Sequence, residues 1–209
     1  MLKEYLEGIK DLTPESNELT HRAFLQILLK GLKDHFNKEF KIEHEPKKDK
    51  QGGQPDFRVS YQGLNIGYIE NKRAGTDLSQ LLKSEKSNQI LKYLELNPNL
   101  MLTNYLNFMW VGKDEKNVPL IKKEISVASL DELSKPLKPN PQTERDLIGF
   151  FKGFFNYEAA PIANAKDFAT HLSPRTKYLK DALIKYQKVD QISSIFWIAC
   201  LKRISKTLP

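Results

Sequence analysis

Two acidic residues and one lysine carry the strongest chemical signal in the sequence. Asp56 begins one pattern typical of a β-strand, and Glu70 and Lys72 end a second. Hard divalent cations such as Mg²⁺ bind one or two carboxylates and complete their shell with water and phosphate oxygens. Such an ion activates water, and a nearby lysine orients that water or neutralises charge that develops on a phosphodiester. These residue types therefore predict metal-dependent hydrolysis of a phosphodiester.

The two strand patterns must pair as a hairpin for these side chains to meet. Side chains alternate along a strand, so Glu70 and Lys72 point to the same face. Pairing around Gly63 sets Asp56 opposite Glu70, whereas pairing around Leu64 sets Asp56 opposite Lys72. Either odd-length loop brings all three side chains to one face, and a two-residue loop separates them. The alternative is a surface hairpin whose Glu–Lys ion pair contributes little stability.

An α/β pattern surrounds this hairpin in the first 140 residues. After Thr13 and Pro14, apolar residues recur three and four apart, which predicts a helix over residues 15–36 that carries Glu18 one turn before Arg22. A second helix is predicted over 78–96. The predicted strands cover residues 40–42, 55–61, 66–72, 100–103, 107–111 and 118–125. This order indicates a mixed sheet with helices.

A change in composition marks the end of this pattern. Three prolines fall between Lys135 and Pro141, and we place a domain boundary there. The predicted domains are therefore residues 1–140 and a helical extension over residues 141–209. Helices are expected in the extension over residues 147–155, 165–171, 176–186 and 191–204.

Composition narrows the classes of partner. The 209 residues hold 33 Lys and Arg against 26 Asp and Glu, so the formal net charge is +7, which favours a polyanion such as nucleic acid. The single cysteine excludes an intrachain disulfide and fits a reducing compartment. The charged start of the chain lacks the apolar core of a signal peptide, and no apolar stretch is long enough to span a bilayer. We expect a cytoplasmic protein without a membrane partner.

The residues around the hairpin resemble the PD-(D/E)xK nuclease superfamily. Its motif reads here as Pro55-Asp56 and Glu70-Asn71-Lys72. Residues 89–93 match the Gln-x-x-x-Tyr motif that part of the superfamily carries on the helix after the lysine strand. Glu18 matches an additional acid that often joins the metal site. The resemblance implies a restriction-endonuclease-like mixed sheet flanked by helices.

The resemblance also implies roles for single residues. Asp56, Glu70 and Lys72 are expected to be catalytic, with Asp56, Glu70 and Glu18 at a Mg²⁺ ion for which Mn²⁺ substitutes. Gln89 is expected to face the site and bind phosphate or a water molecule of the metal, and Tyr93 to assist it or only to pack. The alternative for Glu18 is an ordinary ion pair with Arg22 at helical spacing.

A narrower resemblance covers nearly the whole chain. Segments 18–22, 54–57, 66–72, 102–105 and 172–177, with Tyr93, look like the N-terminal nuclease region of single-polypeptide restriction–modification enzymes, of type IIG or of the type I single-polypeptide kind. Those proteins continue into a helical spacer, an adenine-specific DNA methyltransferase and a target-recognition domain. The resemblance implies that such domains follow, and that S-adenosylmethionine or ATP acts only through them.

The expected substrate is double-stranded DNA. Dimerisation of the protein on DNA is an open alternative to its acting as a monomer. Lys47, Lys48, Lys50 and Arg73 flank the predicted site and are expected to contact the phosphate backbone, although a solvated loop explains the lysines equally well. We expect a Mg²⁺-dependent endonuclease that leaves a 5′-phosphate. The alternatives are a catalytically silent DNA-binding or interdomain scaffold with a nuclease fold, and a DNA repair nuclease.

Overall fold

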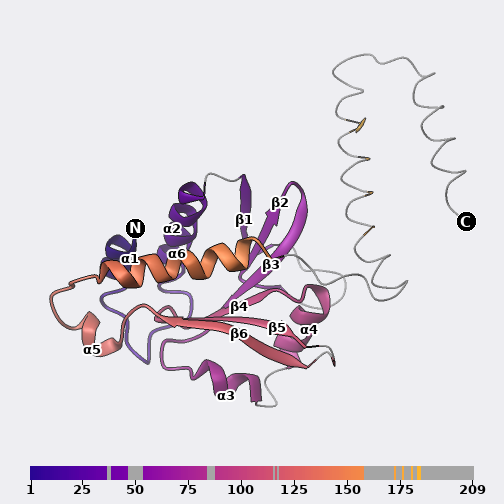
Figure 1. Cartoon of the computed structure of the whole chain (residues 1–209). Helices are drawn as coiled ribbons and strands as arrows, with labels where there is room; N and C mark the ends of the chain where they lie inside the picture. The colour runs from indigo at the N-terminus through magenta and orange to yellow at the C-terminus, as the bar shows by residue number, and fades with distance from the viewer. Residues whose placement is uncertain are drawn as a thin grey trace, which may run out of the picture. The chain divides into compact units, whose positions relative to one another are not determined.

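The computed structural model describes residues 1–36, 39–46, 54–83, 88–114, 116, 118–157, 172, 176, 180, 183 and 184. The chain forms two compact units, Met1–Ala160 and Pro161–Pro209. Every element described below belongs to the first unit (Figure 1). Apart from residues 176, 180, 183 and 184, the helices predicted over 165–171, 176–186 and 191–204 lie outside the described residues.

A mixed sheet of six strands forms the centre of the first unit, and its spatial order is the order of the sequence. The strands are β1 (Phe40–His44), β2 (Phe57–Tyr61), β3 (Leu64–Asn71), β4 (Leu100–Thr103), β5 (Asn107–Lys113) and β6 (Pro119–Ser126). β3 and β4 run parallel, and the other neighbouring pairs are antiparallel. The parallel pair needs a crossover, which contains the helices α3 (Leu78–Lys83) and α4 (Asn88–Leu96). The predicted mixed sheet with helices is confirmed.

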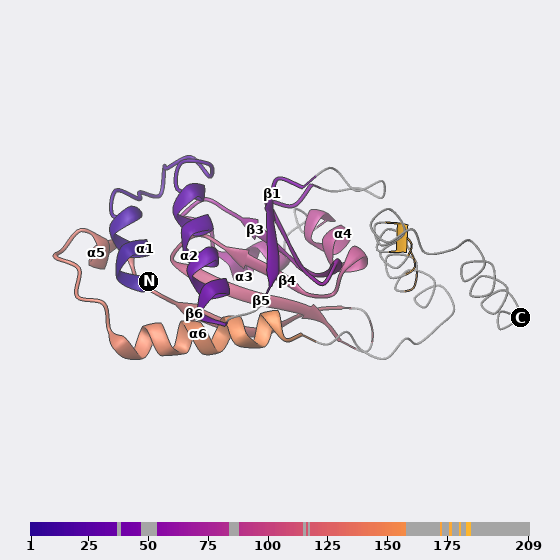
Figure 2. The same ribbon diagram turned by 90° about the horizontal axis from the view of Figure 1, so that it is seen from above.

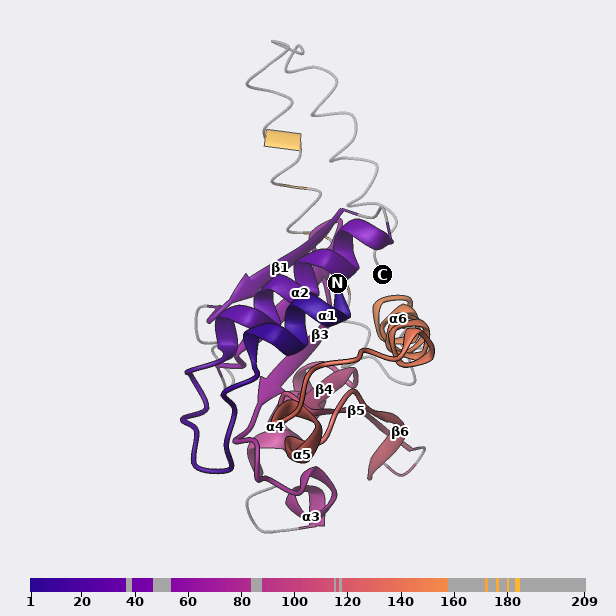
Figure 3. The same cartoon turned by 90° about the vertical axis from the view of Figure 1, so that its left-hand side faces the viewer.

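Helices cover both faces of this sheet. One face packs against α1 (Leu2–Gly8), α2 (Arg22–His35) and α6 (Pro141–Phe155), and the other against α3 and α4. Figure 2 shows α1 and α2 side by side, and Figure 3 shows α2 and α3 on opposite sides of the sheet. Side chains that alternate along the strands fill both cores: Ile69 of β3 packs toward α2, and Tyr68 packs toward α4.

The start of the helix predicted over residues 15–36 is wrong. α2 begins at Arg22 rather than at residue 15, because polar side chains before it bond to nearby backbone. Ser16 Oγ accepts the backbone N–H of Thr13 at 2.9 Å, and Asn17 Oδ1 accepts that of Leu19 at 2.9 Å. These local hydrogen bonds favour turns over helix. Glu18 therefore lies in a turn segment before α2.

The predicted boundary after residue 140 also falls too early. Asn140 caps α6 by accepting the backbone N–H of Gln142 at 2.8 Å, and α6 then packs against the sheet. Its side chains Phe150, Phe151 and Phe154 are fully buried. The first unit consequently extends to Ala160, and the proline-rich run connects α6 to the short helix α5 (Leu130–Leu133) within that unit.

The helix predicted over residues 78–96 corresponds to α3 and α4, and residues 84–87 lie outside the described part of the chain. Among the helices that the structure describes, none is long and apolar enough to cross a membrane.

Candidate metal centre

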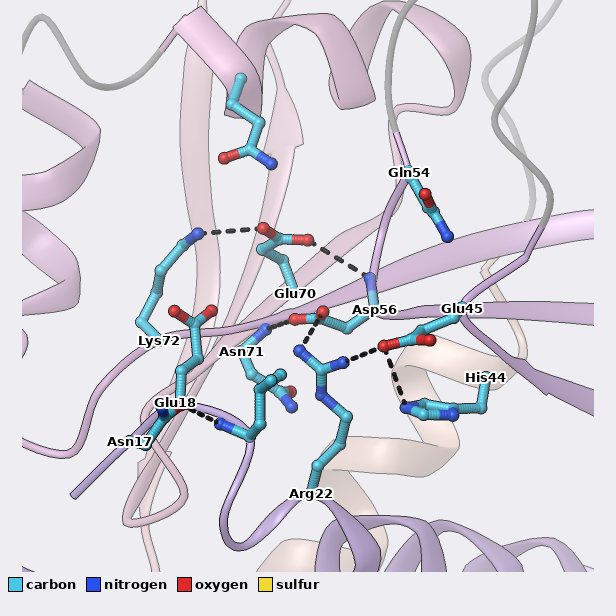
Figure 4. A network of polar contacts seen from close by, with 12 residues as sticks. Asn17, Glu18, Arg22, His44, Glu45, Gln54, Asp56, Glu70, Asn71 and Lys72 are labelled. Atoms are coloured by element: carbon cyan, nitrogen blue, oxygen red, sulfur yellow. Dashed lines mark hydrogen bonds and ion pairs between the residues drawn. The ribbon is translucent and has the colours of Figure 1, made fainter.

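Three carboxylates from distant parts of the sequence converge at one end of the β2–β3 hairpin. Glu18, Asp56 and Glu70 each place one carboxylate oxygen within 4.8 Å of the others. Lys72 follows β3, and its Nζ lies 2.9 Å from Oε1 of Glu70. Figure 4 shows these four side chains pointing toward a common space. The structure thus brings together the three expected metal ligands and the expected catalytic lysine.

The hairpin reaches this arrangement by a route that the sequence did not predict. Its turn has two residues, Gln62 and Gly63, both with positive φ (50° and 78°), as in the turns that match the twist of a hairpin. Next to the turn, Tyr61 pairs with Leu64. Continued without a break, this register would place Asp56 and Glu70 on opposite faces.

A β-bulge in β3 changes the register before the strands reach the site. Ser60 pairs with Asn65, but Val59 pairs with Gly67, so Ile66 is an extra residue on β3. Beyond the bulge, Phe57 is paired with Ile69, which sets the preceding Asp56 opposite Glu70. The backbone N–H of Asp56 donates to Oε2 of Glu70 at 3.4 Å. The expectation that a two-residue loop separates the site residues is therefore wrong, because the bulge restores the shared face.

Both carboxylate oxygens of Asp56 are held in place. Oδ2 accepts the backbone N–H of Asn71 at 2.7 Å, and Oδ1 accepts a guanidinium N–H of Arg22 at 2.5 Å. Arg22 also donates to Oε1 of Glu45 at 2.7 Å. The guanidinium is almost fully buried, and it joins the first turn of α2 to the hairpin and to the end of β1.

Arg22 and Glu45 are site residues that the sequence reasoning missed. The helical spacing in the sequence suggests an ion pair of Arg22 with Glu18. In the described part of the chain, the ion pairs of Arg22 are instead with Asp56 and Glu45. The residue type and its place within segment 18–22 were the available signals. Its partners are 23 and 34 residues away, so no helical spacing could reveal them.

Burial and mutual repulsion raise the pKa values of the acidic cluster. Burial raises the pKa of Glu70 to about 7, with the charge of Asp56 adding to the shift and Lys72 opposing it. Burial also raises the pKa of Asp56, although the N–H of Asn71 and the charge of Arg22 oppose this. For Glu18, burial again raises the pKa, Lys72 lowers it and Asp56 raises it.

The cluster therefore gains from an added positive charge. Three carboxylates in this space match the all-oxygen ligand set that Mg²⁺, Mn²⁺ and Ca²⁺ prefer, a set that water or phosphate oxygens would complete. A divalent ion would favour the ionised form of each acid and offset the repulsion between them. The residues present fit such an ion by the chemistry of their donor atoms.

Gln89 and Tyr93 act on the backbone that leads to Asp56. Gln89 is exposed on α4, and its Nε2 donates to the hydroxyl of Tyr93 at 2.8 Å. The ring of Tyr93 is buried, and its hydroxyl donates to the carbonyl of Gln54 at 3.0 Å. Burial raises the pKa of Tyr93, and the charge of Glu70 raises it further, so the hydroxyl stays protonated at neutral pH. Contact of Gln89 with phosphate stays a prediction.

The expected DNA-backbone residues are placed only in part. Lys47, Lys48 and Lys50 lie outside the described residues. Arg73 is exposed, directly after Lys72, and its charge contributes to lowering the pKa of Glu18. A cationic side chain is therefore close to the rim of the acidic cluster.

No protein-family model, curated protein or solved structure matches the chain.

Proposed function

We propose that the protein is a metal-dependent deoxyribonuclease that hydrolyses phosphodiester bonds in double-stranded DNA. One observation carries the proposal: Glu18, Asp56 and Glu70 converge within 4.8 Å, with Lys72 in contact with Glu70. Three acids and a lysine at the end of a buried hairpin are costly to assemble without a ligand, because the acids repel one another.

Each residue has a defined part in the proposed reaction. Asp56, Glu70 and Glu18 hold a Mg²⁺ ion, for which Mn²⁺ substitutes. When bound, such an ion makes water more acidic and stabilises negative charge on the phosphate. Lys72 orients the attacking water or donates to a phosphate oxygen as charge develops there. Arg22 and the N–H of Asn71 fix the orientation of the Asp56 carboxylate.

Three further features support DNA as the substrate. The chain carries a net charge of +7 although its candidate site is acidic, so the positive charge lies elsewhere and favours a polyanion. Arg73 lies beside the cluster. The sequence resembles the PD-(D/E)xK superfamily at the residues that converge, and we extend the proposal to a restriction-endonuclease-like fold for the mixed sheet.

The biological setting follows from the narrower resemblance. We propose a cytoplasmic restriction–modification enzyme in which this nuclease acts together with a methyltransferase and a target-recognition domain of the same polypeptide. S-adenosylmethionine or ATP would act through those domains. Residues 161–209 would then form part of the spacer toward them.

A second function is favoured by one contact. Arg22 lies 2.5 Å from Asp56 and offsets part of the acidic charge without any metal. A cluster compensated in this way suits a DNA-binding or interdomain scaffold that keeps the nuclease fold but does not cleave. The two functions differ in whether a divalent cation binds at Asp56.

Plasmid cleavage tests the proposal. Supercoiled DNA is incubated with Mg²⁺ or Mn²⁺ and with the wild type, Lys72→Ala or Lys152→Ala, a matched control at an exposed lysine of α6. We expect metal-dependent nicking that falls at least about a hundredfold in Lys72→Ala and stays unchanged in Lys152→Ala. Equal nicking by wild type and Lys72→Ala would contradict the proposal.

Metal titration separates the two functions if the wild type does not cut. Mn²⁺ binding that Asp56→Ala abolishes supports a nuclease centre that needs its further domains or a second copy on DNA. A wild type that binds no Mn²⁺ supports the scaffold.

A further inference from the structure

The turn between β4 and β5 contacts both segments that carry the candidate metal centre. It contains Asn104 and Tyr105 and follows Thr103, the last residue of β4. All three belong to segment 102–105, which has no role in the proposed reaction. The carbonyl of Thr103 accepts the backbone N–H of Lys72 at 2.7 Å. Asn104 Nδ2 donates to the carbonyl of Thr76 at 2.9 Å. This turn therefore holds the chain that leaves β3 through Lys72.

Tyr105 has a backbone conformation that a bulky residue rarely adopts. Its φ is 73°, in the left-handed region where a Cβ atom is crowded. Local hydrogen bonds hold it there: its N–H donates to Thr103 Oγ1 at 3.0 Å, and Asn104 Oδ1 accepts the N–H of Asn107 at 2.8 Å. Such strain persists where surrounding contacts impose it, and it concentrates at functional sites.

The strained residue directs its side chain to the acidic cluster. The ring of Tyr105 is buried, and its hydroxyl donates to the backbone carbonyl of Glu18. The same hydroxyl oxygen accepts a hydrogen bond from Asn71 Nδ2 at 3.4 Å. Asn71 stands between Glu70 and Lys72, so one hydroxyl joins the segment of Glu18 to the strand of Glu70. Burial raises the pKa of Tyr105 to about 12, which keeps the hydroxyl a donor at neutral pH.

Glu18 needs such an anchor because it lies in neither a helix nor a strand. Its neighbours form turns through Asn17, whose side chain accepts the N–H of Leu19 and whose carbonyl accepts that of Thr20. Those contacts shape the turn but do not attach it to the sheet. The bond from Tyr105 does, across 87 positions of sequence.

We propose that Tyr105 is a positioning residue that holds Glu18 at the metal centre. The inference rests on the metal binding in the proposed function, and it does not depend on cleavage. It gives the end of β4 and the β4–β5 turn a role: Thr103 fixes the backbone of Lys72, and Tyr105 fixes the backbone of the segment that carries Glu18.

A double-mutant cycle on Mn²⁺ affinity tests this role. The variants are Tyr105→Phe, Glu18→Gln, the two combined, and Tyr5→Phe. Tyr5 is a matched control because its buried hydroxyl also bonds within this region, to the carbonyl of Tyr105 at 2.8 Å, but does not contact Glu18. Free Mn²⁺ is measured by electron paramagnetic resonance on the full chain, at a temperature where circular dichroism shows every variant folded.

We expect Tyr105→Phe to weaken Mn²⁺ binding about tenfold, as loss of a residue that orients a ligand does. Tyr5→Phe should bind as the wild type does. The combined variant should bind no more weakly than Glu18→Gln alone, because Tyr105 acts through Glu18.

Three results separate failure of this inference from failure of the proposed function. Wild-type affinity in Tyr105→Phe, with weakened binding in Glu18→Gln, overturns the role of Tyr105 and leaves the metal centre standing. Additive losses in the combined variant also overturn it. A wild type that binds no Mn²⁺ overturns the metal centre itself and the inference with it.

Discussion

The two sides of the candidate metal centre are built by different means. The hairpin side contributes Asp56, Glu70 and Lys72 from paired strands and their ends, so the alternation of side chains brings them to one face. The α2 side contributes Glu18 and Arg22 from a turn segment and the first residue of a helix. Its geometry depends on contacts with distant residues. Strand periodicity thus assembles one half of the site, and tertiary hydrogen bonds assemble the other.

The charges of the two sides are interdependent. The cation of the α2 side, Arg22, pairs with an acid of the hairpin side, Asp56. Lys72 pairs within its own side, with Glu70, and also lowers the pKa of Glu18 on the other side. Removing a residue from either side should therefore change the other, and the following predictions measure by how much.

The largest effect is expected for the residue that joins the two sides. Arg22→Met leaves Asp56 buried without its guanidinium partner, and breaking a buried ion pair in this way costs about 3–5 kcal/mol of unfolding free energy. Urea denaturation measures the loss. Arg145→Met is the matched control, because Arg145 is exposed on α6 and its removal should be nearly neutral. A loss below about 1 kcal/mol in Arg22→Met would mean that the two sides are independent.

A slightly smaller effect is expected from pH in the absence of metal. The folded-state pKa of Glu70 is about 7, above the ordinary value of 4.5, so its contribution to stability is complete below pH 4.5 and is lost as pH rises through 7. The difference corresponds to about 3 kcal/mol. Glu70→Gln should therefore be more stable than the wild type by about that amount near pH 8. Near pH 4 the two proteins should have nearly equal free energies of unfolding.

Urea denaturation with a chelator present measures this pH effect. Glu18→Gln should show the same sign with a smaller amplitude, because Glu18 is less buried than Glu70. Parallel stability profiles for the wild type and Glu70→Gln would show that folding does not raise the pKa of Glu70.

Metal affinity should also differ between the sides. Asp56→Asn removes a ligand that is fixed through both oxygens, and we expect Mn²⁺ affinity to fall about a hundredfold. Glu18→Gln removes a half-buried ligand from a turn segment, and we expect a loss of about tenfold. Isothermal titration calorimetry distinguishes these losses. Equal losses would show that the two sides hold the ion with equal strength.

The smallest effects are expected at the support of the hairpin. Tyr93→Phe leaves the carbonyl of Gln54 without its donor and should cost about 1 kcal/mol of stability. Gln89→Ala should cost about 0.5 kcal/mol or less, because Gln89 is exposed and, among the described residues, its side chain bonds only to the hydroxyl of Tyr93. Thermal melting ranks the two. A larger cost for Gln89→Ala would point to a direct role of that side chain.

Much of the hairpin side could be predicted from the sequence. Residues 57–61 alternate between apolar and polar side chains, which identifies the first strand of the hairpin. The alternation of side chains along any strand then puts Glu70 and Lys72 on one face of the second. The strand pattern and the mixed sheet follow from the same periodicity. The bulge at Ile66 could not be predicted, because its cost and its gain depend on packing of β3 against its neighbours rather than on the residue itself.

Much less of the α2 side could be predicted from the sequence. Thr13 and Pro14 have the features of a helix start, yet side-chain hydrogen bonds from Ser16 and Asn17 compete with the helix and delay it to Arg22. The partners of Glu18 and Arg22 come from other elements, and no spacing in the sequence connects them. Only the structure assigns the phenylalanines of α6 to the core of the first unit.

The bulge in β3 has a consequence for how such sites are recognised across sequences. Between Asp56 and Glu70, one unpaired residue compensates a turn of even length, so a turn of either parity can deliver the same pair of acids across the same number of residues. A search template that fixes the length of the turn would separate hairpins that are equivalent in space. Insertions and deletions in this stretch are therefore best tolerated in matched pairs, one at the turn and one at the bulge.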